Sequence, residues 1–306
     1  MRVTVAICTY NRAALLDRTL QAFAQLRIPS GVEWEILVVN NNSSDRTDDV
    51  VAAHAQHLPV RGLFEPQPGK SNAANRAVRE ARGELVLWTD DDVIVDREWL
   101  AEYVAAARQW PSAGYFGGTV DPWFETQPPD WITRNVHVLG EPYALAQHGD
   151  QAFALKDEAV VGANMAARTD VLRQFPFNPA LGPTGGRAMR GEDTELLARF
   201  RAAGLLGVWV GSAKVRHWIS NERLRVKYLW YFYSGLGNYV AHRDTQTSSN
   251  VPRLFGAPRW ALKKYAALLA KCCLSAPARN ERWLRVLRET ALMNGYIQQA
   301  RRQLHS

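Results

Sequence analysis

The first 110 residues alternate between short apolar segments and longer amphipathic segments, and this alternation constrains the fold more than any other feature of the chain. The apolar segments have the length and composition of strands, and the amphipathic ones have helical spacing. The predicted strands cover 3–8, 35–39, 60–66 and 84–88, and the predicted helices cover 13–26, 45–58, 69–83 and 96–110. Strands that alternate with helices form parallel sheets with right-handed crossovers, so the sequence predicts an open α/β sheet.

Polar clusters follow three of these strands, at 9–12, 40–45 and 90–92. The carboxyl ends of parallel strands meet at one edge of the sheet, where such folds bind ligands. We therefore expect the three clusters to lie together.

The cluster in "ELVLWTDDDVIVD" consists of three adjacent carboxylates, which repel one another and prefer water. A solvated acidic loop or an N-cap for the next helix are the ordinary explanations, although Asp96 fits the capping position better. A hard cation held by oxygen ligands would remove the repulsion. No GxGxxG follows the first strand, and the chain has no Walker motif and no nucleophile elbow. A divalent metal that bridges a diphosphate is the economical use of such a site.

The last 85 residues differ from the rest in pattern and in charge. Helical spacing covers 223–242, 257–274 and 279–303, and 222–306 holds 15 of the 37 Lys and Arg but four of the 30 Asp and Glu. A basic amphipathic helix with aromatic residues either lies on an anionic membrane or packs on the rest of the protein. Nucleic-acid binding is not expected, because the front of the chain is mildly acidic and contains no recognisable binding module.

Cysteine content and hydropathy bear on the location. Three cysteines, two of them adjacent, form no disulfide framework, which fits a reducing cytosol. No run of about 18 apolar residues predicts a transmembrane helix. We expect a cytoplasmic protein, with contact to the inner face of the membrane as one alternative.

The motifs "VAICTYNR", "EILVVNNNSSDRT", "GKSNAANRA", "LWTDDD", "VGANMAARTDVL" and "GEDTELLAR" occur in this order. Their order and spacing resemble those of family 2 glycosyltransferases, inverting enzymes of the GT-A fold that use nucleotide sugars, of the type that builds bacterial surface polysaccharides. The resemblance covers about residues 2–220. It implies a catalytic domain over 1–221, with a nucleotide-sugar half at about 1–120 and an acceptor half at about 121–221. A basic helical extension over 222–306 would follow.

The resemblance also implies a nucleotide pocket. Its members would be Thr9, Tyr10, Arg12, Asn40, Asp45, Lys70, Asn72, Asn75, Asp90 and Asp91. Asn40 stands where many members have an Asp that contacts the base, and an amide suits uracil without excluding guanine or thymine. Asp91 is also a candidate for a structural role between its two neighbours.

Sugar-binding, metal and catalytic residues follow from the same resemblance. The sugars would lie near Gly117, Gly118, Asn164 and Trp123. Asp92 and His217 would hold Mn²⁺ or Mg²⁺, and Asp193, beside Glu192, would be the general base. The alternatives are an ordinary histidine at 217, carboxylates that favour a helix N-terminus at 192–193, and a core tryptophan at 123. The glycine-rich segment 181–191 resembles a mobile lid or acceptor loop.

The sequence thus predicts metal-dependent transfer from a nucleotide sugar, with UDP expected, to a glycan or lipid-linked acceptor. Two other functions remain open. A sugar nucleotidyltransferase shares the sheet and metal but has a glycine-rich basic loop after its first strand, which "CTYNRAALL" lacks. A non-catalytic glycan- or membrane-binding subunit would be expected to lose the acidic residues that are present here.

Overall fold

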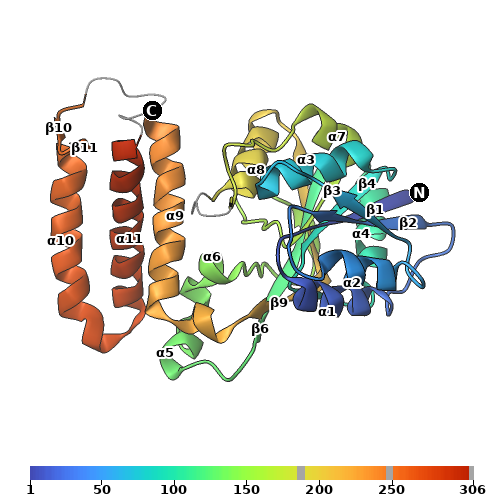
Figure 1. The fold of residues 1–306 in the computed structure, drawn as a ribbon, viewed down its shortest axis with the longest axis horizontal. Helices are drawn as coiled ribbons and strands as arrows, with labels where there is room; N and C mark the ends of the chain where they lie inside the picture. Colours follow the sequence, from blue (N-terminus) through green and yellow to red (C-terminus); the bar gives the residue numbers. More distant parts are fainter. Residues whose placement is uncertain (185–189, 246–250, 303–306) are drawn as a thin grey trace. The chain divides into compact units, whose positions relative to one another are not determined.

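The computed structural model describes residues 1–184, 190–245 and 251–302, which form two compact units (Figure 1). The first unit comprises Met1–Trp123, Ala144–Ala180 and Glu192–Trp218. The second comprises Phe124–Tyr143, Leu181–Gly191 and Ile219–Ser306. The two units are thus interleaved along the chain, whereas the sequence predicts one boundary near residue 221. The catalytic domain over 1–221 and the extension over 222–306 stay predictions.

A nine-stranded mixed sheet forms the centre of the first unit. Its strands are β1 (Arg2–Thr9), β2 (Glu33–Asn40), β3 (Val60–Phe64), β4 (Leu85–Asp90), β5 (Val93–Val95), β6 (Ala113–Phe124), β7 (Ala152–Ala154), β8 (Asn164–Arg168) and β9 (Leu206–Ile219). The order is β3-β2-β1-β4-β8-β6-β9-β5, with β7 also paired to β9. The strands β3, β2, β1 and β4 are parallel as expected, while β8 runs antiparallel to β4. The predicted α/β fold is confirmed.

Helices cover both faces of the sheet (Figure 1). They are α1 (Ala13–Phe23), α2 (Thr47–His54), α3 (Lys70–Glu80), α4 (Trp99–Gln109), α7 (Thr169–Gln174) and α8 (Glu192–Ala202). Successive strand residues point to opposite faces, so β1 sends Val5 and Ile7 into the core with α1, α2 and α4, and Ala6 into the core with α3, α7 and α8. Such strands, buried on both faces, are the reason for the continuous apolar runs in the sequence.

The short strand β5 was not expected from the sequence. It directly follows Asp92 and pairs antiparallel with β9, so that Val93 lies opposite His217. Three apolar residues after a charged triplet give too weak a periodic signal to predict a strand. This pairing places His217, near the end of β9, beside the aspartates of the triplet.

The second unit is helical. It contains α5 (Asp130–Thr133), α6 (Gly140–Tyr143), α9 (Val226–Thr245), α10 (Arg259–Ser275), α11 (Glu281–Arg302), the 3₁₀ turns η1 (Val136–Val138), η2 (Asn221–Leu224) and η3 (Ala276–Ala278), and the hairpin β10 (Arg253–Leu254) and β11 (Ala257–Pro258). The three long helices confirm the predicted C-terminal helices, and α11 lies between α9 and α10 (Figure 1). None of the helices in the described part of the chain is both long and apolar enough to cross a membrane. Of the predicted lid, residues 185–189 lie outside the described residues.

Two glycines allow α9 and α11 to pack closely. A Cβ atom on Gly295 would lie 1.8 Å from the backbone oxygen of Ser234, and one on Gly237 would lie 2.0 Å from that of Leu292. Because both obstacles are backbone atoms, a side-chain rotation cannot relieve the clash.

Gly295→Ala is therefore expected to destabilise the helical unit, although alanine is the better helix former by about 1 kcal/mol. We expect a net loss of about 2 kcal/mol or more, because the helices must move apart. Urea denaturation followed by circular dichroism measures it. Gly114→Ala is the matched control, since its added Cβ would lie 3.5 Å from Leu205, an ordinary contact. Equal stability of the two variants would contradict the expected clash.

Candidate active site

The three polar clusters meet at the carboxyl edge of the sheet, as the sequence predicts. Thr9 at the end of β1 donates a hydrogen bond from Oγ1 to Asp91 Oδ2 at 2.8 Å. The backbone N–H of Asn11 donates to Ser43 Oγ at 2.9 Å, and that of Ser44 donates to Asn11 Oδ1 at 2.7 Å. Asn11 and Asn42 have φ angles of 52° and 67°, which asparagine tolerates better than most residues. Their structural role was missed, and the only signal was asparagine in two turn-like clusters.

Two cations lie beside the aspartates of the triplet, one at Asp90 and one shared by Asp91 and Asp92. Lys70 Nζ lies 2.8 Å from Asp90 Oδ1. Arg12 Nη1 donates to Asp91 Oδ1 and to Asp92 Oδ2, both at 2.9 Å. The repulsion within the triplet is thus balanced from two sides.

Burial and charge shift the pKa values of this cluster. Burial raises the pKa of Asp91 to about 6; Arg12 opposes the rise and the neighbouring Asp92 charge adds to it. Burial alone would lower the pKa of Arg12, but the Asp91 and Asp92 carboxylates raise it above its usual value. The pKa of Lys70 is raised in the same way, by the carboxylates of Asp90 and Glu192. Both basic groups therefore stay charged and hold the acidic ones in place.

Asp90, Asp92 and His217 form a candidate metal centre. One ligand atom from each lies within 4.8 Å of the other two, and Asp92 and His217 are buried. His217 Nε2 lies 3.3 Å from Asp92 Oδ1, because β5 pairs with β9 in the register described above. Two carboxylates and one imidazole suit Mn²⁺ or Mg²⁺, so the donor set fits the predicted metal.

Asp193 and Glu192 begin α8 and line a pocket at the same edge. The pocket is also lined by Cys8, Lys70, Ala74, Trp88, Thr89, Asp90, Gly162, Met165 and Phe177. Asp193 accepts hydrogen bonds from the backbone N–H of Gly162 at 3.0 Å and of Thr194 at 2.8 Å. Glu192 Oε1 lies 3.7 Å from Lys70 Nζ. The ammonium group thus connects the end of β4 to the start of α8.

Cys8 lines this pocket and was not predicted as a site residue. Loss of solvation raises the pKa of its thiol to about 12, with Asp90 and Asp91 adding to the rise against Lys70. Since the thiolate is the reactive form, we expect iodoacetamide at about pH 8 to modify the exposed Cys273 and to leave Cys8 unmodified. Peptide mass spectrometry of the folded protein measures both. Equal modification would show that the thiol is not desolvated.

The side chains of Asn40 and Asp45 form hydrogen bonds with other groups of the protein. Asn40 donates from Nδ2 to Asp48 Oδ1 and accepts from the Ser43 N–H, both at 2.8 Å. Asp45 accepts the N–H of Ala13 at 2.9 Å and so caps α1 from a distant loop. Their contact with a nucleotide stays a prediction.

Asn72 and Asn75 lie on the first turns of α3. Asn72 Nδ2 donates to the Pro68 carbonyl at 3.0 Å. The amide of Asn75 exchanges two hydrogen bonds of 2.8 Å with the backbone of Phe177 and thereby connects α3 to the segment after α7. Tyr10, in contrast, is half exposed at the sheet edge.

Asn164, Gly117 and Gly118 lie inside the sheet and not on its surface. Asn164 is fully buried; its amide accepts from Trp99 Nε1 at 2.7 Å and Tyr103 Oη at 2.8 Å and donates to two backbone oxygens. A Cβ on Gly118 would lie 2.4 Å from a backbone oxygen, and one on Gly117 would lie 2.5 Å from Val160. Strand packing uses the Asn164 amide and leaves no room for a side chain at Gly117 or Gly118. The location of the sugars near these residues stays a prediction.

Two arginines, one from α1 and one from β9, lie against the ring of Trp123 near the end of β6. The guanidinium carbons of Arg18 and Arg216 lie 5.5 Å and 5.8 Å from the ring centroid. Trp123 is partly exposed, so it is not a core tryptophan, and its contact with a sugar stays a prediction.

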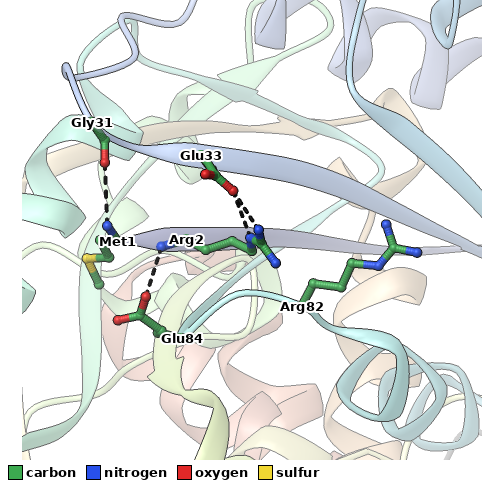
Figure 2. A pocket seen from close by; sticks show the side chains of 6 residues that line it. All are labelled: Met1, Arg2, Gly31, Glu33, Arg82 and Glu84. Carbon is green, nitrogen blue, oxygen red and sulfur yellow. Dashed lines mark hydrogen bonds and ion pairs between the residues drawn. The ribbon is translucent and has the colours of Figure 1, made fainter.

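A second pocket lies at the opposite edge of the sheet, at the amino ends of β1 and β2 (Figure 2). There the guanidinium of Arg2 donates a hydrogen bond to Glu33 Oε2, and the backbone N–H of Arg2 donates to Glu84 Oε1 at 3.2 Å. This pocket contains none of the predicted site residues.

Comparison with known proteins identifies the family. Residues 4–175, more than half of the chain, match the family model for glycosyl transferase family 2. A probable glycosyltransferase of Bacillus subtilis, YdaM, is 26% identical over 203 residues, which are 65% of this chain and 46% of YdaM. The chain spans less than half the length of the first curated relatives that it matches.

Solved structures agree in fold. The mannosyltransferase PcManGT from Pyrobaculum calidifontis, solved with GDP-Man and Mn²⁺, has a TM-score of 0.65 at 21% identity over 97% of this chain and 86% of its own. TarS residues 1–349 from Staphylococcus aureus, solved with UDP, has a TM-score of 0.56 at 16% identity over 100% of this chain and 91% of its own. The chain belongs to glycosyltransferase family 2 and has the GT-A fold.

Proposed function

We propose that this enzyme transfers a sugar, with inversion and with the help of a divalent metal, from a UDP-sugar to a hydroxyl of a glycan or lipid-linked acceptor. One observation carries the proposal. Asp90 belongs both to the candidate metal cluster and to the lining of the pocket that contains Asp193. One cavity can therefore hold both the leaving diphosphate, beside the candidate metal cluster, and the attacking hydroxyl, beside Asp193.

Mn²⁺ or Mg²⁺ held by Asp90, Asp92 and His217 would supply positive charge to the leaving diphosphate. Arg12 keeps Asp92 in position from one side through its hydrogen bond to Oδ2. Lys70, half-buried and bonded to Asp90, would add a second positive charge beside the diphosphate.

Asp193 is the proposed general base. Inversion requires one carboxylate that removes the proton from the acceptor hydroxyl as it attacks from the side opposite the diphosphate. The two backbone N–H groups fix the orientation of the Asp193 carboxylate. Glu192, paired with Lys70, would position this helix end.

Relatives differ in the nucleotide that they bind. PcManGT was solved with GDP-Man, and TarS with UDP and with UDP-GlcNAc. Asn40 supports uracil only through its ability to donate and accept, and its amide is bonded within the protein. The proposal of UDP therefore needs a direct test. A cytoplasmic location likewise stays a prediction from the cysteines.

Calorimetric titration of UDP, GDP and dTDP, each with and without Mn²⁺, tests the proposed donor. We expect UDP to bind at least about tenfold more tightly with Mn²⁺ than without it, because a cation held by the aspartates would attract the diphosphate. Preference for GDP or dTDP would reassign the donor and keep the reaction. Metal-independent binding of all three would contradict the metal site.

A further inference from the structure

Large apolar side chains that are exposed to solvent are concentrated on one part of the second unit. The described residues include eight such side chains, and five lie between 254 and 274: Leu254, Phe255, Trp260, Leu269 and Leu274. Phe255 and Leu274 are 79% and 85% exposed. Surface apolar residues scattered singly are normal, but a concentration of this kind marks an interaction surface.

The same segment carries only positive charge. No Asp or Glu occurs between Asp244 and Glu281, a stretch that contains six basic residues: Arg253, Arg259, Lys263, Lys264, Lys271 and Arg279. Most of them lie on α10 or next to it. The partner of this surface is therefore expected to be anionic.

Helix α10 separates its buried and exposed sides. Ala261, Leu268 and Cys272 are buried, and the helix packs on α11. Trp260, Lys264, Lys271 and Leu274 repeat at helical spacing in an exposed stripe that flanks the buried one, so lysine and large apolar residues share this stripe. Long lysine side chains can lie along an apolar surface and keep their charge at its rim.

The turn before α10 is unusual. Phe255 and Gly256 connect β10 to β11 and have φ angles of 49° and 76°. Such two-residue turns prefer Asn-Gly, because asparagine tolerates positive φ and a bulky aromatic residue does not. Phenylalanine at this position reduces the stability of the fold in two ways, through backbone strain and through exposure of its ring to water. Its presence therefore points to a functional reason.

We propose that the β10–β11 turn and the exposed face of α10 (residues 253–275, the basic-apolar surface) dock on an anionic lipid bilayer. Phe255 and Leu274 would enter the boundary between headgroups and acyl chains, and the lysines would contact anionic headgroups. A second copy of this chain fits poorly, because two surfaces of the same charge would face each other. This inference goes beyond sugar transfer and does not depend on it.

Flotation of the full chain with lipid vesicles tests the proposal. We expect binding to vesicles with about 30% phosphatidylserine, at least about tenfold weaker binding to pure phosphatidylcholine, and loss of binding in about 0.5 M salt. Phe255→Asn is the sharpest variant, because asparagine suits this turn better than phenylalanine. It should keep or raise the stability and weaken vesicle binding by about tenfold.

Two charge variants complete the experiment. Lys263→Gln, Lys264→Gln and Lys271→Gln together should weaken binding by about tenfold or more. Arg97→Gln, Arg108→Gln and Lys156→Gln together remove the same charge from exposed positions in the first unit and should change it by less than about twofold.

Three results would overturn the proposal. One is absence of vesicle binding, and another is equal binding to neutral and anionic vesicles. The third is a dimer in light scattering that Phe255→Asn converts to monomer. Because no donor or acceptor is present, failure here leaves the proposed transfer reaction untouched.

Discussion

Replacing Asp193 by asparagine is expected to lower kcat by about two to four orders of magnitude, the usual contribution of a general base. Asparagine has nearly the same shape and keeps an oxygen that can accept a backbone N–H, so the pocket should persist. It cannot take a proton from the acceptor hydroxyl. The measurement is release of the nucleoside diphosphate from the donor that the titrations select, with acceptor present.

Glu195→Gln is the matched control on the same helix. Glu195 pairs with Arg199 at 2.8 Å, away from the pocket lining, and its loss should change kcat by less than about twofold. The KM for the donor should stay nearly constant in Asp193→Asn, because the proposed role begins when the hydroxyl attacks. A loss of kcat below about tenfold would exclude Asp193 as the base.

Asp92→Asn is expected to abolish metal-dependent nucleotide binding and to reduce transfer by about a thousandfold or more. The substitution removes one of the two carboxylates in the candidate metal cluster and leaves Arg12 with one carboxylate instead of two. Mn²⁺ titration followed by electron paramagnetic resonance measures the metal, and calorimetry measures the nucleotide.

The control for this variant is Asp157→Asn, an exposed aspartate outside the metal cluster. Its metal affinity should equal that of the unmodified enzyme. Retention of Mn²⁺ binding in Asp92→Asn, with folded protein, would show that Asp90 and His217 suffice or that the metal binds elsewhere.

Local patterns predicted the parallel strands of the first unit, the helices between them and the edge at which the polar clusters meet, but not the short strand β5. Strand β1 could be predicted because its apolar residues are continuous, and the position of Thr9 followed from the direction of parallel strands. The helices α9, α10 and α11 were predictable for the same reason, since their spacing is visible within the segment itself.

The sequence identified candidate positions for the site, but it did not predict which atoms each side chain contacts. Asn164 and Gly118 stand in the expected motifs, yet packing between β6, β8 and β9 uses them fully. An amide in a motif looks the same whether it faces a ligand or the core. Only its neighbours in space distinguish the two.

By itself, the sequence determined the alternation of strands and helices, the shared edge of the three polar clusters and the basic character of the C-terminal helices. The tertiary structure alone decided which side chains meet there. Lys70 reaches both Asp90 and Glu192, and the antiparallel pairing of β5 with β9 brings His217 to Asp92. The physical reason is range: periodicity and strand direction are local properties, whereas these contacts join residues about 20 to 125 positions apart, which only the packing of the sheet brings together.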